Sequence, residues 1–259
     1  MNNQPIRLNK AIADSGLCSR READRLIENG HVAVNGNTVT LLGTQVNPAR
    51  DSIRVHGKKL PQTETLYLAF HKPKGVVTTR RDERDRGTIY DWLPPECQAA
   101  DPAGRLDRNS SGLLILSTDG RFLQALTHPS KGWVKRYRVT LDRPLTQADA
   151  RKLLTGLKIP GDERLYVMQQ ITAVTTGVSE KRKPLYDMDL ITGYNRQIRV
   201  SLEALGYEVQ GLKRTEFGPV RLGRLKTGSV RPLSNTELRA LKAVLPARAS
   251  SKRGTKRKP

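Results

Sequence analysis

Cysteine and histidine are scarce in this sequence of 259 residues. The two cysteines, Cys18 and Cys97, lie far apart, and neither belongs to a CxxC pair. Their spacing supports neither a disulfide framework nor a zinc site, and free thiols fit the reducing environment of the cytoplasm. The four histidines do not have the spacing of metal ligands either.

Long apolar segments are also missing. Even runs such as Leu66–Phe70 are far shorter than the roughly 20 residues that a membrane-spanning helix needs. The first residues contain no apolar core of a secretion signal. We therefore expect a cytoplasmic protein with no membrane partner.

Acidic residues are strongly outnumbered by basic ones. Lys and Arg total 46 against 25 Asp and Glu, which gives a formal net charge of +21 and a pI near 10.4. A globular protein this basic usually binds a polyanion, most often nucleic acid. Residues 247–259 contain six of the basic residues and no acid. We expect them to form a disordered tail that binds nucleic acid through charge.

Several motifs of cofactor and metal enzymes are absent: GxxxxGK(S/T), GxGxxG, HExxH and GxSxG. An enzyme with this sequence is expected to use no cofactor and no metal, and to rely on a carboxylate.

The candidate carboxylate is Asp107, which lies between Arg105 and Arg108 in the glycine-bounded stretch 104–112. The apolar run Leu113–Leu116 follows at once and predicts a strand buried on both faces. Asp107 is then expected at the edge of a rigid sheet. An Asp in a polar loop can also be a turn former or a solvated charge, and the local pattern does not exclude this.

Residues 1–60 have the pattern of a small separate domain. Leu8 and Ile12 share the apolar face of one predicted helix, and Ser19 with Glu22 forms a capping box that starts a second. The turn at Asn35-Gly36 predicts a hairpin. Arginines off the apolar stripe of the second helix either form a solvated face or contact phosphates.

The segment RLNKAIADSGLCSRREADRLIENGHVAVNG resembles the S4 RNA-binding module, a pair of short helices followed by a small sheet. The resemblance implies an αL-type fold for residues 1–60. Its implied RNA-binding residues are Arg7, Lys10, Arg20, Arg21 and Arg25.

Residues 61–65 read as a linker to a second domain at 66–246, because the segment is polar and has no apolar periodicity. Strands are expected at 66–70, 76–77, 113–116, 135–141, 186–191 and 207–212. Helices are expected at 89–93, 122–129, 145–157, from an Asn195 N-cap to 205, and 238–245. Trp92 is expected in the core.

Four segments of this second domain resemble the pseudouridine synthases of the RsuA/RluA superfamily. They are KPKG at 72–75, GRLDRNSSGLLILSTDG at 104–120, KRYRV at 135–139 and GYNRQIR at 193–199. Within the superfamily the sequence is most similar to the F branch of the ribosomal large-subunit synthases. The resemblance implies an α+β fold with a mainly antiparallel mixed sheet flanked by helices.

The same resemblance implies isomerisation of uridine to pseudouridine in ribosomal RNA, after the base flips out of its stack. Asp107 would be the essential carboxylate, attacking C1′ or C6 or removing a ribose proton, and these alternatives stay open. Arg199 would pair with Asp107, and Tyr137 would stack on the uracil and serve in proton transfer. The residues expected to contact RNA are Arg105, Leu106, Arg108, Arg196, Gln197 and Ile198.

The expected partner is 23S ribosomal RNA, with transfer RNA as a secondary substrate, and the protein is expected to be a monomer. Two other functions fit parts of the sequence. An S4 module also suits a non-catalytic RNA-binding factor in ribosome assembly. A retaining glycoside hydrolase also breaks a glycosidic bond, but it needs two paired carboxylates.

Overall fold

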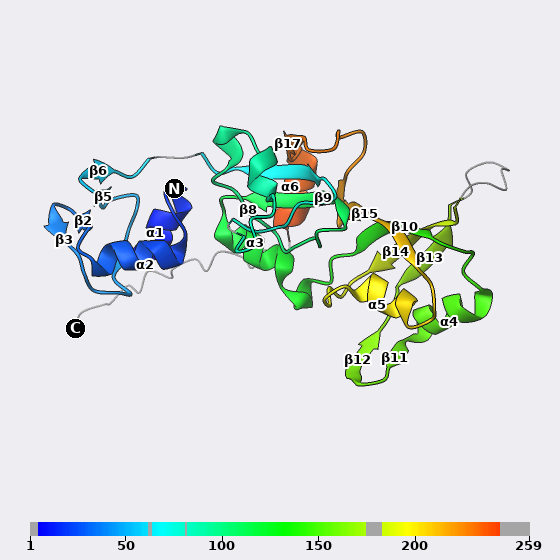
Figure 1. Ribbon diagram of the computed structural model, residues 1–259. Helices are drawn as coiled ribbons and strands as arrows, with labels where there is room; N and C mark the ends of the chain where they lie inside the picture. The colour runs from blue at the N-terminus through cyan, green and yellow to red at the C-terminus, as the bar shows by residue number, and fades with distance from the viewer. Residues whose placement is uncertain (1–4, 62–63, 81, 175–182, 244–259) are drawn as a thin grey trace, which may run out of the picture.

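The computed structural model describes residues 5–61, 64–80, 82–174 and 183–243, and its elements form two domains (Figure 1). The predicted tail and part of the predicted linker lie outside these residues. The smaller, N-terminal domain has two helices and two small sheets, ordered β1–β4 and β3–β2–β5–β6. Its elements are β1 (Ile6–Arg7), α1 (Leu8–Asp14), α2 (Arg20–Glu28), β2 (Val32–Val34), β3 (Asn37–Thr38), β4 (Gln45–Val46), β5 (Ile53–Val55) and β6 (Lys58–Lys59).

Local sequence signals account for this domain. The Ser19 side chain accepts a hydrogen bond from the Glu22 amide at 3.2 Å, as the N-cap of α2. Asn35 and Gly36 both have positive φ, 51° and 89°, which a tight hairpin between β2 and β3 requires. Leu8, Ile12 and Ile27 are buried together in the core between helices and sheet. These predictions are confirmed.

The larger domain is built on a sheet ordered β13–β14–β10–β15–β9–β7–β17, in which β8 also pairs with β9 and β16 also pairs with β15. All pairings in this sheet are antiparallel except that of β15 with β9. The fold is thus α+β with a mainly antiparallel mixed sheet, as predicted. Its strands are β7 (Tyr67–Lys72), β8 (Asp101–Pro102), β9 (Ser111–Ser117), β10 (Lys135–Leu141), β11 (Leu157–Ile159), β12 (Asp162–Tyr166), β13 (Gln170–Ala173), β14 (Leu185–Leu190), β15 (Val209–Phe217), β16 (Val220–Arg221) and β17 (Val230–Pro232).

The helices of this domain cover the two halves of the sheet (Figure 1). They are α3 (Gly120–Thr127), α4 (Gln147–Thr155), α5 (Gln197–Glu203) and α6 (Asn235–Lys242), with 3-10 turns η1 (Ile89–Trp92), η2 (Pro95–Cys97) and η3 (Pro129–Lys131). One half packs Leu113 and Ile115 of β9 against Phe122 of α3. The other half packs Val139 and Met188 against Leu202 of α5.

The two halves join at the parallel pairing of Gly112 with Arg214. Gly112 has φ +109°, and a Cβ there would lie 2.2 Å from the Arg214 carbonyl oxygen. Only glycine permits both this conformation and this close approach. The predicted loop around Asp107 therefore ends at the joint between the halves.

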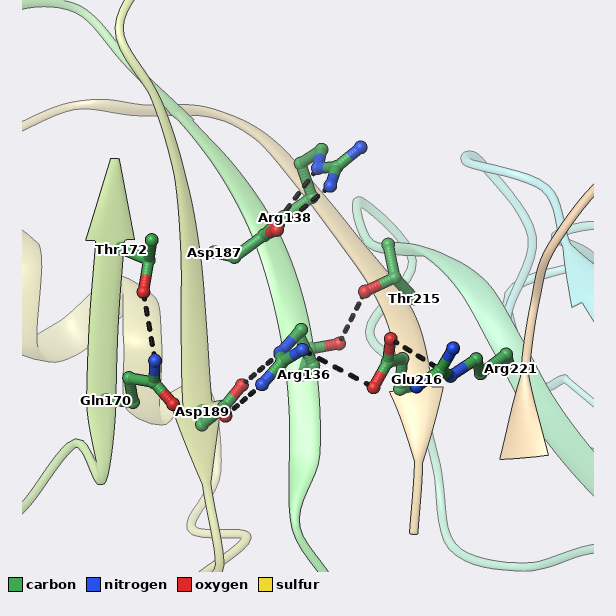
Figure 2. Close-up of polar contacts among 9 residues, drawn as sticks. All are labelled: Arg136, Arg138, Gln170, Thr172, Asp187, Asp189, Thr215, Glu216 and Arg221. Carbon is green, nitrogen blue, oxygen red and sulfur yellow. Dashed lines mark hydrogen bonds and ion pairs between the residues drawn. The ribbon is translucent and has the colours of Figure 1, made fainter. Parts of the chain in front are cut away.

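The face of β10 and β14 opposite α5 carries a ladder of ion pairs (Figure 2). Arg136 donates two hydrogen bonds to the Asp189 carboxylate, at 2.8 and 2.7 Å, and Arg138 donates two to Asp187, both at 2.9 Å. Glu216 on β15 lies 3.6 Å from Arg136. Strand alternation thus separates a charge-paired face from an apolar one.

Several sequence predictions differ from the structure, including the helix expected at 89–93, which is the 3-10 turn η1. Val76 and Val77 form no strand, because Val77 makes only an isolated bridge to Thr88. Trp92 is not in the core: it is 48% exposed, with its ring lying over Gly228. The N-cap of α5 is Arg196, not Asn195, in a left-handed conformation. The pattern also missed the hairpin of β11 and β12. Among the described residues, no helix is long and apolar enough to cross a membrane.

Candidate active site

A cleft of about 380 Å³ lies where the two halves of the larger domain meet. One wall is the loop of residues 103–107, and the opposite wall is the loop of residues 192–198. Strands β10, β14 and β15 form its base through Tyr137, Leu190 and Arg214. Asp107 is the one acidic residue among those that line it. A retaining glycoside hydrolase needs two carboxylates at its site, and only one lines this cleft among the residues that the structure describes.

The loop that carries Asp107 is held from below by the Lys72 side chain. Lys72 is fully buried, and its Nζ donates to the carbonyls of Pro73 and Ser110 at 2.9 Å and of Asp107 at 3.2 Å. Burial lowers the pKa of Lys72 to about 8, although attraction to Asp107 opposes this. The Thr78 hydroxyl also donates to the Leu106 carbonyl at 2.8 Å. The half-buried Asp107 thus sits on a rigid backbone.

Arg199 lies behind the cleft surface and also fixes this loop. Its guanidinium donates to the carbonyls of Val209 at 2.9 Å and Asn109 at 3.1 Å, and its Nε has no partner among the described residues. Burial and the charge of Arg196 lower its pKa, and attraction to Asp107 opposes them. No ion pair within 4.0 Å joins Asp107 to a described side chain. The expected direct pairing of Arg199 with Asp107 is therefore not formed here.

Tyr137 lines the cleft together with two cations, Lys135 and Arg214. Arg214 on the neighbouring strand donates to the Tyr137 hydroxyl at 3.5 Å. Lys135, two residues earlier on β10, donates to the Ile191 carbonyl at 2.7 Å. Burial, and then repulsion from Arg214, lower the pKa of Lys135 to about 8. The half-buried phenol ring of Tyr137 thus faces a strongly positive environment.

The other predicted contacts fall into two groups. Arg105 and Arg196 line the cleft with exposed side chains, where both can reach a phosphate. Leu106, Gln197 and Ile198 also line it but are buried, so they shape the walls. The Gln197 side chain accepts from the Thr192 hydroxyl at 2.9 Å, which holds the opposite loop.

Arg108 does not line the cleft. Its Nε donates to the Gly75 carbonyl at 3.0 Å, and its own carbonyl accepts from the Gly75 amide at 2.8 Å. It therefore ties the Asp107 loop to the segment after β7.

The basic residues predicted in the N-terminal domain belong to β1, α1 and α2 (Figure 1), and none of them lines the cleft. Lys10 pairs with Asp14, and Arg25 pairs with Glu22 at 3.2 Å. Arg20 contacts Asn9 at 3.4 Å, while Arg7 and Arg21 are exposed. The basic surface of this domain therefore consists of the exposed Arg7, Arg20 and Arg21, which have no acidic partner within 4.0 Å among the described residues.

Sequence reasoning missed three functional candidates: Lys72, Lys135 and Arg214. Lys72 and Lys135 lie in segments whose resemblance was recognised, but a lysine in a motif gives no sign of its burial. The two-residue period of a strand could have indicated Arg214, because it lies two residues after Leu212 and therefore on the same inward face of β15. A fully buried arginine is rare unless it is paired, so an arginine at an inward strand position is a candidate for a special role.

A single carboxylate in a cleft lined by cations, on a basic chain with a separate helix-pair domain, defines an enzyme that acts on nucleic acid. The chain belongs to the RNA pseudouridylate synthase family, whose model matches residues 66–204, and residues 6–51 match the S4 domain. It is thus an RNA pseudouridine synthase. Among the described residues, no cluster of His, Cys, Asp and Glu could hold a metal ion.

Named relatives agree with this assignment. The chain is 35% identical over 238 residues to ribosomal large subunit pseudouridine synthase B of Bacillus subtilis, covering 92% of this chain and 96% of that one. It is 36% identical over 237 residues to the dual-specificity RNA pseudouridine synthase RluF of Escherichia coli, covering 90% and 77%. A crystal structure of a pseudouridylate synthase superposes with TM-score 0.63 at 27% identity, covering 91% and 99%. The alternative of a non-catalytic assembly factor finds no support here.

Proposed function

We propose that this synthase modifies uridine in 23S ribosomal RNA, with transfer RNA as a secondary substrate, and works as a cytoplasmic monomer. The proposal rests on the relatives, one named for the large ribosomal subunit and one for dual specificity. The net charge of +21 supports binding to a long polyanion. Under this proposal residues 1–60 form the S4 domain, 61–65 the linker, 66–246 the catalytic domain and 247–259 the basic tail.

Asp107 is the proposed catalytic carboxylate, and the observation that carries this role is its position as the one acid lining the cleft. The reaction breaks the bond between C1′ and N1 of the uridine, turns the base, and joins C1′ to C5. N1 gains a proton and C5 loses one, so no oxidant or reductant is consumed. Asp107 attacks C1′ or C6 or removes a ribose proton, and each role requires its ionised form.

The uridine must leave its stack to reach Asp107. The cleft volume of about 380 Å³ falls in the range of small-ligand sites, which suits one extruded nucleotide. Unstacking a base costs a few kcal/mol. Arg105 and Arg196 on opposite walls are placed to hold the neighbouring phosphates, and the basic surface of the N-terminal domain adds affinity. Arg108 is proposed to act indirectly, because its hydrogen bonds to Gly75 fix the loop that carries Asp107.

Tyr137 is proposed to stack on the turned uracil and to accept the proton that leaves C5. Arg199 is proposed as a positioning residue, because its two hydrogen bonds hold the Asn109 and Val209 carbonyls around the Asp107 loop. Its charge attracts the Asp107 carboxylate without touching it.

The direct test is Asp107→Asn, assayed for pseudouridine formation and for RNA affinity. Loss of charge at nearly constant shape should abolish product while RNA affinity stays within about twofold of wild type, a change of less than 0.5 kcal/mol. Asp101→Asn is the matched control, an exposed Asp to Asn change in the same domain that should leave activity intact. Product formation by Asp107→Asn at the wild-type rate would refute the role of Asp107.

A further inference from the structure

Arg214 is a buried cation to which neither the resemblance nor the comparisons assign a role. The residue is 3% exposed on β15, in the middle of the sheet. Its Nε donates to the Leu113 carbonyl at 2.7 Å, and one terminal nitrogen donates to the Tyr137 hydroxyl at 3.5 Å. Its other terminal nitrogen is buried and has no partner among the described residues.

This arrangement is unusual for an arginine in this domain. On the opposite face of the sheet, Arg136 and Arg138 are each matched by a carboxylate that accepts two hydrogen bonds (Figure 2). Arg214 is more buried than either, yet no described acid lies within 4.0 Å of it. A buried charge without a counter-ion is costly, and such costs concentrate at functional sites.

The chemistry of the cleft indicates where the missing negative charge belongs. Lys135 also lies at the base of the cleft, and the charge of Arg214 helps to lower its pKa to about 8. Asp107 lies on the wall formed by residues 103–107, and no hydrogen bond or ion pair joins it to Arg214. Besides the Leu113 carbonyl, Arg214 reaches one side-chain oxygen, that of Tyr137, whose ring centroid lies 6.0 Å from the guanidinium carbon.

We propose that Arg214 is a positioning residue for Tyr137, which aims the phenol and stabilises negative charge on its oxygen while the C5 proton is transferred. This inference rests on the proposed role of Tyr137. Once C1′ has joined C5, that carbon carries both the ribose and a hydrogen. The Tyr137 phenol first gives its proton to N1 of the turned base, and Arg214 holds the phenolate that results. The C5–H bond then breaks, its electron pair restores the C5–C6 double bond, and the C5 proton passes to the phenolate oxygen, which restores the phenol. N1 has gained one proton and C5 has lost one, so the step balances.

The test is a double-mutant cycle read out on the C5–H bond. Single-turnover rates are measured on RNA with either hydrogen or deuterium at C5 of the target uridine, for wild type, Arg214→Gln, Tyr137→Phe and the double variant. Arg214→Gln should slow product formation by roughly 10²- to 10³-fold, as expected when a group that stabilises developing charge is removed. Its deuterium effect should exceed that of wild type, because deprotonation becomes limiting. In the Tyr137→Phe background, Arg214→Gln should add little.

Matched variants separate this role from a structural one. Lys213→Gln removes a cation from the preceding residue of β15, on the opposite face, and should leave the deuterium effect unchanged. Arg214→Lys keeps the charge, so it should recover part of the rate and serves as the test if Arg214→Gln does not fold. Thermal unfolding and RNA affinity establish that each variant is folded.

Two results would overturn the inference: an unchanged deuterium effect in a folded Arg214 variant, or losses that multiply in the double variant. Either would leave the proposed function standing if wild type makes pseudouridine. Failure of wild type to make pseudouridine in any RNA tested would instead refute the function itself.

Discussion

Lys135 lies at the base of the cleft with a pKa lowered to about 8 by burial and by Arg214. Its positive charge is therefore present near neutral pH and is lost as the pH rises through about 8. A phosphate or a carbonyl of the RNA that contacts this lysine is held only by the protonated form. RNA binding by the protein should follow that titration.

We expect the RNA affinity of wild type to fall by about tenfold between pH 7 and pH 9, the size of one charge-assisted hydrogen bond. Filter binding or fluorescence anisotropy at constant ionic strength measures it. In Lys135→Gln the affinity should be low at both pH values and nearly independent of pH. The control Lys158→Gln, an exposed lysine outside the cleft, should keep the wild-type pH dependence.

Unfolding does not explain such a loss. The pKa of Lys135 is lower in the folded protein than the value of 10.5 expected for the unfolded chain. The unfolded chain then binds more protons between pH 8 and 10.5, so this lysine makes the protein more stable as the pH rises through that window. An affinity that stays constant from pH 7 to pH 9 in wild type would show that Lys135 does not contact the RNA.

At the scale of elements, the parallel joint between β9 and β15 holds the two walls of the cleft together. Gly112 pairs there with Arg214, so the strand that begins just after Asp107 touches the strand that carries Arg214. A displacement at this joint would move the carboxylate relative to Tyr137.

Gly112→Ala should therefore destabilise the catalytic domain by roughly 2–5 kcal/mol, the sum of a positive-φ penalty and an overpacked contact. The new Cβ would meet the Arg214 backbone at 2.2 to 2.9 Å. Gly104→Ala is the matched control: its φ is also positive, but the nearest atom is 3.8 Å away, so roughly 1–2 kcal/mol is expected. Urea unfolding compares the two, and equal losses would mean that the close approach is unimportant.

Elements with a strong local signal could be predicted from the sequence. The apolar run of β9, the alternation in β10 and the Ser19 cap of α2 are all found in the structure. Strand β15 was predicted to stop at Leu212, because Lys213, Arg214 and Glu216 interrupt the apolar pattern that follows. In the structure the strand continues to Phe217. Trp92 was assigned to the core by residue type, yet its short 3-10 turn leaves the ring half-exposed.

The candidate site could be predicted only in part, for a related reason. The matched motifs predicted that Asp107 and Tyr137 belong to one site, and in the structure both line the same cleft. The partners of a buried polar group depend on strands far apart in sequence, such as Lys72 with Ser110 or Arg214 with Leu113. No pattern local to Arg199 indicates that it binds backbone carbonyls instead of Asp107.

At the scale of the whole molecule, many of the cations that should add RNA affinity lie outside the cleft in which the reaction takes place. The cleft, the N-terminal domain and residues 248–259 each contribute cations, and the last segment has six Lys and Arg with no acid. Deleting it should weaken RNA binding and reduce the slope of log affinity against log salt by up to roughly 4, at about 0.7 per phosphate on single strands. The modified uridine should not change.

A variant with those six residues replaced by glutamine keeps the chain length and should match the deletion. Salt titrations of RNA binding and a map of the modified position compare the variants with wild type. A shift of modification to another uridine would show that the segment reads sequence.

The central claim is that Asp107 in this cleft converts uridine of large-subunit ribosomal RNA to pseudouridine. Pseudouridines are mapped across the ribosomal and transfer RNA of cells that lack the protein, and of the same cells supplied with wild type or with Asp107→Asn. The account predicts that at least one pseudouridine of 23S RNA disappears without the protein, returns with wild type and stays absent with Asp107→Asn. Identical maps in all three strains, or restoration by Asp107→Asn, would contradict it.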